Sequence, residues 1–209
     1  MVNLRGRFER YVGRQHGRPR GLVGRFMGEK MVRQHGAETL WALSLLDLAP
    51  TDRVLDIGCG AGAGTALLTA QTPRGHVSAV DLSPTMVDAA TRRNSRAVAH
   101  GFVDVRRADV AALPYAARLF DKVVSVHSLY FWTDPERAVA EIARVLAPGG
   151  RLVLTYSPGK IGLPEDAPTH ALVHGRIVPA VERAGLSAIA LSEGPAARRY
   201  RAVAVTAVR

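Results

Sequence analysis

The sequence has little cysteine, few aromatic residues and no long apolar run, and these shortages exclude several classes of protein. A single cysteine, Cys59, cannot form an internal disulfide, so a disulfide-stapled secreted domain is excluded. Apolar stretches such as Arg151–Tyr156 are far shorter than the roughly 20 residues of a membrane-spanning helix. The first residues are charged where a signal peptide needs an apolar segment. We therefore expect a cytoplasmic protein without a membrane anchor.

Lysine is also scarce, because Lys30, Lys122 and Lys160 are the only lysines among 28 basic residues, and the net charge is +10. Arginine binds phosphates with two parallel hydrogen bonds, so the surplus allows an RNA partner. A coding bias toward Ala, Gly and Arg would give the same composition. The basic residues crowd into the first 33 positions without the regular aromatic interleaving typical of RNA-binding modules. A small-molecule partner is therefore favoured over nucleic acid, and no feature indicates an oligomeric state.

A length of 209 residues with 47% apolar content fits one globular domain and excludes disorder as the main state. We divide the chain into a basic N-terminal helical arm, residues 1–35, and a single domain, residues 36–209. The arm has scattered apolar residues, including Phe8, Tyr11 and Phe26, which a purely solvated tail would not need. We expect the arm to form a lid over an acceptor pocket, although packing on a distant helix would explain the same residues.

Short apolar strands alternate with helical periodicity along most of the domain. The expected strands are Arg53–Ile57, His76–Asp81, Val103–Ala108, Phe120–Val126, Arg151–Tyr156, Ser187–Ser192 and Tyr200–Val208, and the expected helices are Gly36–Leu48, Gly64–Gln71, Pro84–Arg93, Pro135–Leu146 and Thr169–Ala184. This alternation predicts an α/β fold with a mostly parallel, Rossmann-like doubly wound sheet. The last two strands flank Gly194-Pro195 and are expected to pair as an antiparallel hairpin.

A glycine-rich turn and two aspartates mark the ends of the first three strands. Gly58, Gly60 and Gly62 follow the first strand, where glycine permits both a tight turn and close approach of a nucleotide cofactor. Asp81 ends the second strand, where it can accept hydrogen bonds from ribose hydroxyls, and Asp109 ends the third, within reach of an adenine amino group. Each aspartate alone would pass for a helix cap. Together they predict an adenosine site.

The sequence resembles the class I S-adenosylmethionine-dependent methyltransferases, in particular their small single-domain bacterial members. The resemblance rests on five motifs in order: Val54–Gly62, Ala79–Met86, Arg107–Tyr115, Phe120–Ser125 and Arg144–Gly150. It implies a seven-stranded sheet with an antiparallel last strand and S-adenosyl-L-methionine as cofactor. The cofactor contacts that it implies come from Asp56, Gly58, Cys59, Gly60, Asp81, Leu82, Met86, Asp109 and Val110.

Asp56 also separates this family from dehydrogenases, which have no reason to carry an acid two residues before the first glycine. Its carboxylate either fixes the loop or reaches the cofactor amine through water; the alternative is a buried cap for backbone N–H groups.

His127, at the end of the fourth strand, is the candidate catalytic base because its ordinary pKa lies near neutrality. The alternative is an imidazole that only packs and hydrogen-bonds in the crevice. His35 is a secondary candidate, and Tyr130, Phe131 and Trp132 either line an acceptor pocket or cover the core. No group of His, Cys or Asp has metal-ligand spacing, so no metal is expected.

We therefore expect a methyltransferase that acts on a small molecule, in the setting of specialised metabolism. Two rivals stay open. One is an RNA methyltransferase, which the arginine-rich arm would favour. The other is a cofactor-binding fold that no longer methylates, because a fold alone does not fix its chemistry.

Overall fold

The computed structural model describes residues 21, 26, 35–196 and 200–209. The arm and lid predicted for residues 1–35 therefore lie outside the described residues, apart from Gly21, Phe26 and His35. Among the residues that are described, no helix is both long enough and apolar enough to cross a membrane.

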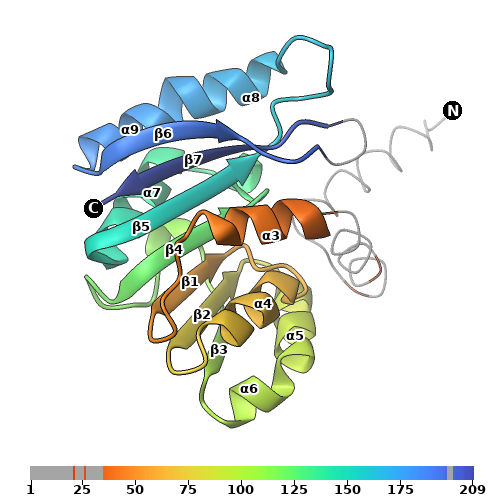
Figure 1. Cartoon of the computed structure of the whole chain (residues 1–209), viewed down its shortest axis with the longest axis vertical. Coiled ribbons are helices and arrows are strands. Elements are labelled where there is room, and N and C mark those ends of the chain that lie inside the picture. Colours follow the sequence, from red (N-terminus) through yellow and green to blue (C-terminus); the bar gives the residue numbers. More distant parts are fainter. Residues whose placement is uncertain (1–20, 22–25, 27–34, 197–199) are drawn as a thin grey trace, which may run out of the picture.

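A single seven-stranded sheet forms the centre of the domain (Figure 1). Its strands are β1 (Arg53–Ile57), β2 (His76–Asp81), β3 (Val103–Arg107), β4 (Phe120–Val126), β5 (Leu146–Tyr156), β6 (Ser187–Glu193) and β7 (Val203–Val208). They lie in the order β3-β2-β1-β4-β5-β7-β6, in which β7 is antiparallel to both neighbours and the other pairs are parallel. The predicted mostly parallel sheet with a C-terminal hairpin is confirmed.

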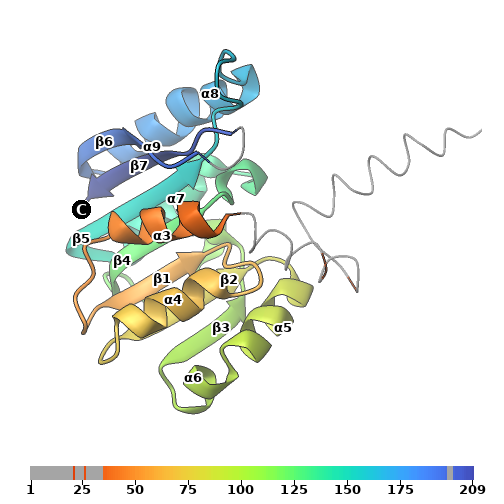
Figure 2. The same ribbon diagram turned by 45° about the vertical axis from the view of Figure 1, so that its right-hand side comes forward.

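Helices cover both faces of the sheet. They are α3 (Gly36–Ser44), α4 (Ala63–Gln71), α5 (Pro84–Arg93), α6 (Ser95–Ala99), α7 (Pro135–Val145), α8 (Ala167–Leu172) and α9 (Val178–Arg183), with short 3₁₀ turns η1 (Val110–Ala112) and η2 (Leu129–Phe131). In Figure 2, α3 and α4 lie in front of the sheet and α7 and α9 lie behind it. The doubly wound arrangement is therefore confirmed, and α6 is an addition that the sequence pattern did not indicate.

Two apolar cores follow from the period of two in the strands, because successive side chains point to opposite faces. Val54 packs in one core with Leu43 of α3 and Leu68 of α4. Its neighbour Leu55 packs in the other core with Ile142 of α7. All of these side chains are buried, so strands that read as continuous apolar runs are covered on both faces.

The two helices that were predicted to begin at a proline have a capping residue directly before that proline. Ser83 precedes Pro84 and its Oγ accepts a hydrogen bond from the Met86 N–H, while Asp134 precedes Pro135 and accepts from the Arg137 N–H. Proline suits the first helical turn because its missing N–H would have no intrahelical partner there. Both helices begin at the predicted residue.

Several elements differ from the prediction at their ends or within their length; α3, for example, ends at Ser44 rather than Leu48. β5 begins at Leu146 rather than Arg151, because Phe120 pairs with Leu146 before an irregularity in the β4–β5 ladder. The predicted helix Thr169–Ala184 is interrupted by a π-helical segment, Val173–Ile177. Pro179 lies two residues after this segment, and its missing N–H removes a regular α-helical hydrogen bond. β7 begins at Val203, since Tyr200 forms only an isolated bridge with Lys160.

We predict that Gly62→Ala destabilises the protein more than Gly101→Ala. Both glycines have left-handed backbone, with φ of +78° and +75°, so either alanine costs roughly 1–2 kcal/mol. A Cβ at position 62 would also lie 2.8 Å from the Ala90 Cα, whereas nothing lies within 4 Å of one at position 101. The clash should add roughly 1–3 kcal/mol in urea unfolding. Equal losses for the two variants would show that α4 and α5 pack more loosely here than the structure indicates.

Candidate functional site

A cavity of about 560 Å³ lies at the carboxyl ends of the parallel strands, where ligands bind in open α/β sheets. The segments that follow β1, β2, β3 and β4 all contribute to its lining, as does the beginning of α3. Every residue that the sequence predicted for the site lines it: Asp56, Gly58, Cys59, Gly60, Asp81, Leu82, Met86, Asp109, Val110 and His127.

The glycine turn after β1 is held by the end of β2. The N–H groups of Gly58 and Cys59 donate to the Val80 carbonyl over 2.8 and 3.1 Å, and the Gly60 N–H donates to the Asp81 Oδ2 over 3.0 Å. A Cβ on Gly58 would lie 2.4 Å from the Ser128 Cβ, while Gly60 has open space at its Cα. Glycine is thus needed at position 58 for packing, and at position 60 it leaves the backbone open to a ligand.

Asp81 supports this turn and still faces the cavity. Its Oδ1 accepts a hydrogen bond from the Ser83 N–H over 2.8 Å, and its Oδ2 accepts the Gly60 bond. A carboxylate oxygen can accept two hydrogen bonds, so each oxygen has capacity left for a ligand hydroxyl. Burial raises the pKa of Asp81, and the two backbone hydrogen bonds only partly offset that rise.

Asp56 is buried beside the same turn. Its Oδ2 accepts a hydrogen bond from the Thr65 hydroxyl over 2.7 Å, which fastens α4 to β1. Burial raises the pKa of Asp56 to about 6, against the lowering effect of Thr65 and with a further rise from Asp81. Among the described residues no backbone N–H donates to Asp56, so it does not act as the backbone cap that one interpretation of the sequence proposed.

Cys59 and Asp109 both lie at the cavity wall. Burial raises the pKa of the Cys59 thiol, and the nearby Asp56 and Asp81 raise it further, which disfavours a nucleophilic thiolate. Asp109 accepts a hydrogen bond from the Ala111 N–H over 3.0 Å and so caps η1. The cap uses one oxygen, Oδ1, of the Asp109 carboxylate.

The aromatic cluster after β4 is divided between the cavity and the core. Phe131 and Trp132 line the cavity, as one of the two interpretations expected. Tyr130 packs against the core, and its hydroxyl is hydrogen-bonded to the Ser157 backbone N–H.

His127 belongs to a cluster that the sequence did not reveal. Its Nε2 lies 2.8 Å from the Glu38 Oε2, and the Nδ1 of His35 lies 2.5 Å from the same oxygen. Burial raises the pKa of Glu38, but the hydrogen bonds and charges of His127 and His35 outweigh it and lower the pKa to about 2. Glu38 was missed because its partner lies 89 positions away; the His35-x-x-Glu38 spacing, one helical turn, was the only signal.

The same three residues place their ligand-type atoms within 4.8 Å of one another. Spacing along the chain did not indicate this group, since it joins α3 to the end of β4. The distances of 2.5 and 2.8 Å are those of hydrogen bonds between imidazole nitrogens and a carboxylate.

The sequence and the fold are similar to those of known methyltransferases. The family model described as "Methyltransferase domain" matches residues 55–154. The demethylmenaquinone methyltransferase of Thermus thermophilus is 37% identical over 128 residues, which cover 59% of this chain and 56% of that protein. The 27-O-demethylrifamycin SV methyltransferase of Amycolatopsis mediterranei is 36% identical over 126 residues, covering 59% and 46%. The chain thus spans about half the length of these curated relatives.

Among solved structures, an S-adenosylmethionine-dependent methyltransferase from Aquifex aeolicus superposes with a TM-score of 0.71 at 19% identity, over 87% of this chain and 96% of that one. At this identity the likeness shows the fold. Of the five sequence motifs, Val54–Gly62, Ala79–Met86 and Arg107–Tyr115 contribute residues to the cavity lining. Residues 55–154 thus match the methyltransferase-domain family in sequence, and the described residues have the fold of the Aquifex aeolicus methyltransferase.

Proposed function

We propose that this protein binds S-adenosyl-L-methionine in the cavity and transfers its methyl group to a small-molecule acceptor. The observation that carries the proposal is the pair of buried carboxylates, Asp56 and Asp81, beside the glycine turn. Burial raises the pKa of both, and within the described residues neither forms an ion pair. Such a wall favours a cationic ligand and opposes the pyrophosphate of a dinucleotide.

The residues around the turn fit the parts of this cofactor. The open backbone at Gly60 suits the methionine portion, and the spare acceptor capacity of Asp81 suits two ribose hydroxyls. Asp109 stands at the end of β3 for the adenine amino group, and apolar Leu82 and Val110 flank that part of the cavity. The cofactor would supply a methyl group already activated on a sulfonium, so the chain mainly aligns the acceptor and excludes water.

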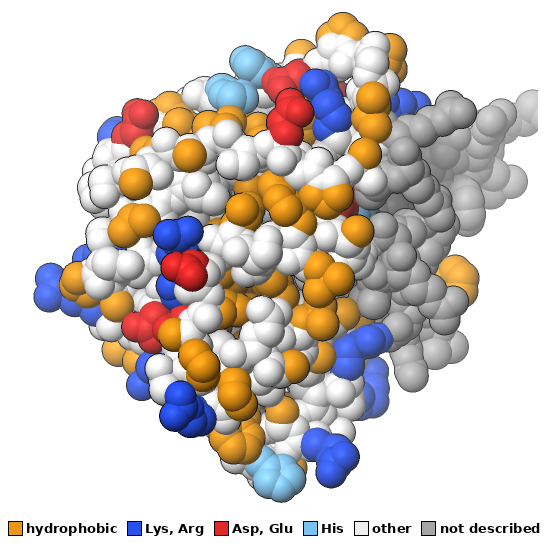
Figure 3. Space-filling model, in the orientation of Figure 1, with side chains coloured by type: hydrophobic (Ala, Val, Ile, Leu, Met, Phe, Trp, Pro, Cys, Tyr) orange, Lys and Arg blue, Asp and Glu red, His pale blue; other side chains and the backbone are white. Residues whose placement is uncertain are grey.

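A small acceptor accounts for the cavity better than RNA does. Its volume of about 560 Å³ is in the range of small-molecule sites. On the face shown in Figure 3, the described Lys and Arg side chains are scattered in small groups and form no continuous basic track. The names of the two curated relatives refer to small molecules, which supports a similar acceptor class here, in specialised metabolism.

We expect S-adenosylmethionine and S-adenosylhomocysteine to bind and NAD⁺ to bind far more weakly, because the carboxylate wall repels pyrophosphate. Isothermal titration of the full chain with each compound tests this. Tight binding of NAD⁺ without any response to the sulfonium compound would overturn the assignment.

We expect Asp81→Ala to weaken S-adenosylhomocysteine binding about ten- to hundred-fold, since charge-assisted hydrogen bonds to ribose contribute about 1.5–3 kcal/mol. Asp121→Ala is the matched control, because Asp121 accepts a backbone hydrogen bond from Arg53 at the start of β1, away from the cavity. Its affinity should equal that of the wild type. If both variants bound alike, another acid would have to hold the ribose.

A further inference from the structure

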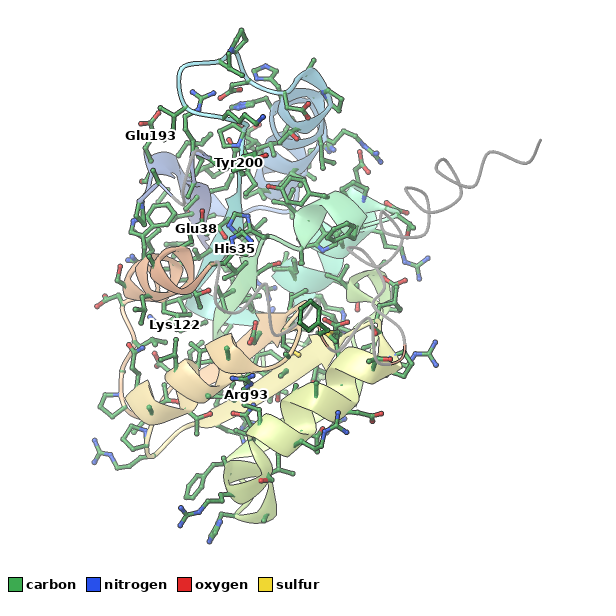
Figure 4. The ribbon with its side chains drawn as sticks, turned by 90° about the vertical axis from the view of Figure 1, so that its right-hand side faces the viewer. His35, Glu38, Arg93, Lys122, Glu193 and Tyr200 are labelled. Atoms are coloured by element: carbon green, nitrogen blue, oxygen red, sulfur yellow. The ribbon has the colours of Figure 1, made fainter. Side chains whose placement is uncertain are left out.

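We propose that Glu38 positions His127 as a general base for a neutral hydroxyl acceptor, and that His35 holds Glu38 in place for this task. The inference rests on the proposed function and names its substrate class. Glu38, in the first turn of α3, contacts His127 at the end of β4, beside the cavity. His35 and Glu38 lie side by side at the start of α3 (Figure 4).

One carboxylate oxygen serves both rings. The Oε2 of Glu38 accepts from the His127 Nε2 over 2.8 Å and from the His35 Nδ1 over 2.5 Å, and the ring centroids lie 4.8 Å apart. The Glu38 side chain is 1% exposed and that of His127 is 11% exposed. Because the anion is withdrawn from water, these two bonds provide the polar contacts that water would otherwise supply.

The hydrogen bonds fix which nitrogen of His127 is free. A neutral imidazole that donates from Nε2 leaves Nδ1 as its acceptor atom. No other described residue forms a hydrogen bond with this ring, and His127 lines the cavity. Its Nδ1 is therefore available to an acceptor bound there.

The backbone of His127 is held in an unusual conformation. Its φ is +53°, in the left-handed region, and its N–H donates to the Thr155 carbonyl over 3.1 Å. A residue other than glycine keeps such a conformation where the surrounding structure enforces it, which is frequent at functional sites. The ring is thus fixed from its backbone and from Glu38 together.

The carboxylate of Glu38 is placed to form an ion pair with His127 once the ring takes a proton. Glu38 keeps its negative charge, because its pKa lies near 2 despite burial. Among the described residues, the other titratable groups facing Glu38 are His35, just before α3, and Tyr130 in η2. Burial raises the pKa of Tyr130 to about 12, with a lowering effect of the Ser157 hydrogen bond and a further rise from the Glu38 charge, so its phenol stays neutral. An imidazolium at His127 would form an ion pair with Glu38, as in other acid-oriented histidine bases.

Methyl transfer to a hydroxyl moves one methyl group and one proton. As the acceptor oxygen bonds to the methyl carbon, the carbon–sulfur bond breaks and its electron pair stays on sulfur. The hydroxyl proton moves to the Nδ1 of His127 and leaves as the product departs. A thiolate or carboxylate acceptor has no proton to lose near neutral pH and would not need this base.

The walls near His127 indicate the kind of hydroxyl. Leu40, Val126, Phe131 and Trp132 line the cavity and lie within five positions of Glu38 or His127 along the chain, so we infer that the acceptor group is carried on an apolar frame. A phenol fits both requirements, because it is apolar and its hydroxyl is largely neutral at pH 7.

The test is a histidine ¹⁵N NMR titration of the full chain with S-adenosylhomocysteine present. In the wild type, neutral His127 should carry its proton on Nε2. In Glu38→Gln, the fraction of neutral His127 that carries its proton on Nε2 should fall, since the charged acceptor that favours this tautomer is replaced by an amide. His35→Gln should give a smaller fall. A proton on Nδ1 in the wild type, or the same tautomer fractions in wild type and Glu38→Gln, would overturn the proposal.

Two further measurements separate this inference from the proposed function. Calorimetry with S-adenosylhomocysteine should give equal affinities for wild type and Glu38→Gln. Absence of binding to the wild type would refute the proposed function, while the ¹⁵N NMR experiment would still report the tautomer of His127. Zinc titration should show no tight stoichiometric site. A tight site lost in Glu38→Gln would assign the cluster to a metal and overturn the base.

The acceptor class has its own probe. 4-Nitrophenol added to the S-adenosylhomocysteine complex below the phenol's own pKa should gain phenolate absorbance as His127 takes the proton. His127→Asn, in which asparagine tolerates the left-handed backbone, should lose that signal. No phenolate signal from the wild type at millimolar 4-nitrophenol would overturn the assignment of phenols to this pocket.

Discussion

The attachment of the glycine turn to the end of β2 is the constraint on which the rest of the site depends. The N–H groups of Gly58 and Cys59 donate hydrogen bonds to the Val80 carbonyl, and that of Gly60 donates to the Asp81 carboxylate. Because these acceptors belong to the neighbouring strand, the parallel register of β1 and β2 sets the position of the turn. The start of α4 follows from it, and the Asp56–Thr65 bond then ties that helix back to β1.

This arrangement places charge where burial makes it costly. The charge of Asp81 raises the pKa of Asp56, and both carboxylates raise the pKa of the Cys59 thiol. The hydrogen bonds that the two carboxylates accept do not fully offset desolvation. Glu38 behaves in the opposite way, because two imidazoles lower its pKa despite its burial. Arg93 also lines the cavity, where its Nε donates to the Ala61 carbonyl. The cavity therefore has one wall with two carboxylates that form no ion pair within the described residues, and another wall where two imidazoles face the Glu38 carboxylate. The first suits a cationic cofactor and the second suits proton transfer.

The sequence could predict whatever depends on neighbours along the chain. Alternating apolar strands, the Ser83-Pro84 and Asp134-Pro135 helix starts, and glycines at a strand end all carry local signals, and the structure has them at those places. The start of β5 at Leu146 depends instead on pairing with Phe120. Glu38 could not be assigned for the same reason, since an acid in a first helical turn usually favours the helix dipole and here it serves a histidine of another element.

The two walls of the cavity also differ in where they lie along the chain. The proposed cofactor contacts, from Asp56 to Val110, fall within residues 55–154, the segment shared with the methyltransferase family. His35 and Glu38 precede that segment; because α3 packs against β4, His35 lines the cavity and Glu38 contacts His127. Similarity within the shared segment thus bears on the cofactor, whereas the choice of acceptor depends on what α3 brings to His127. A relative with the same glycine turn and a different first turn in α3 would keep the cofactor site and lose the positioned base.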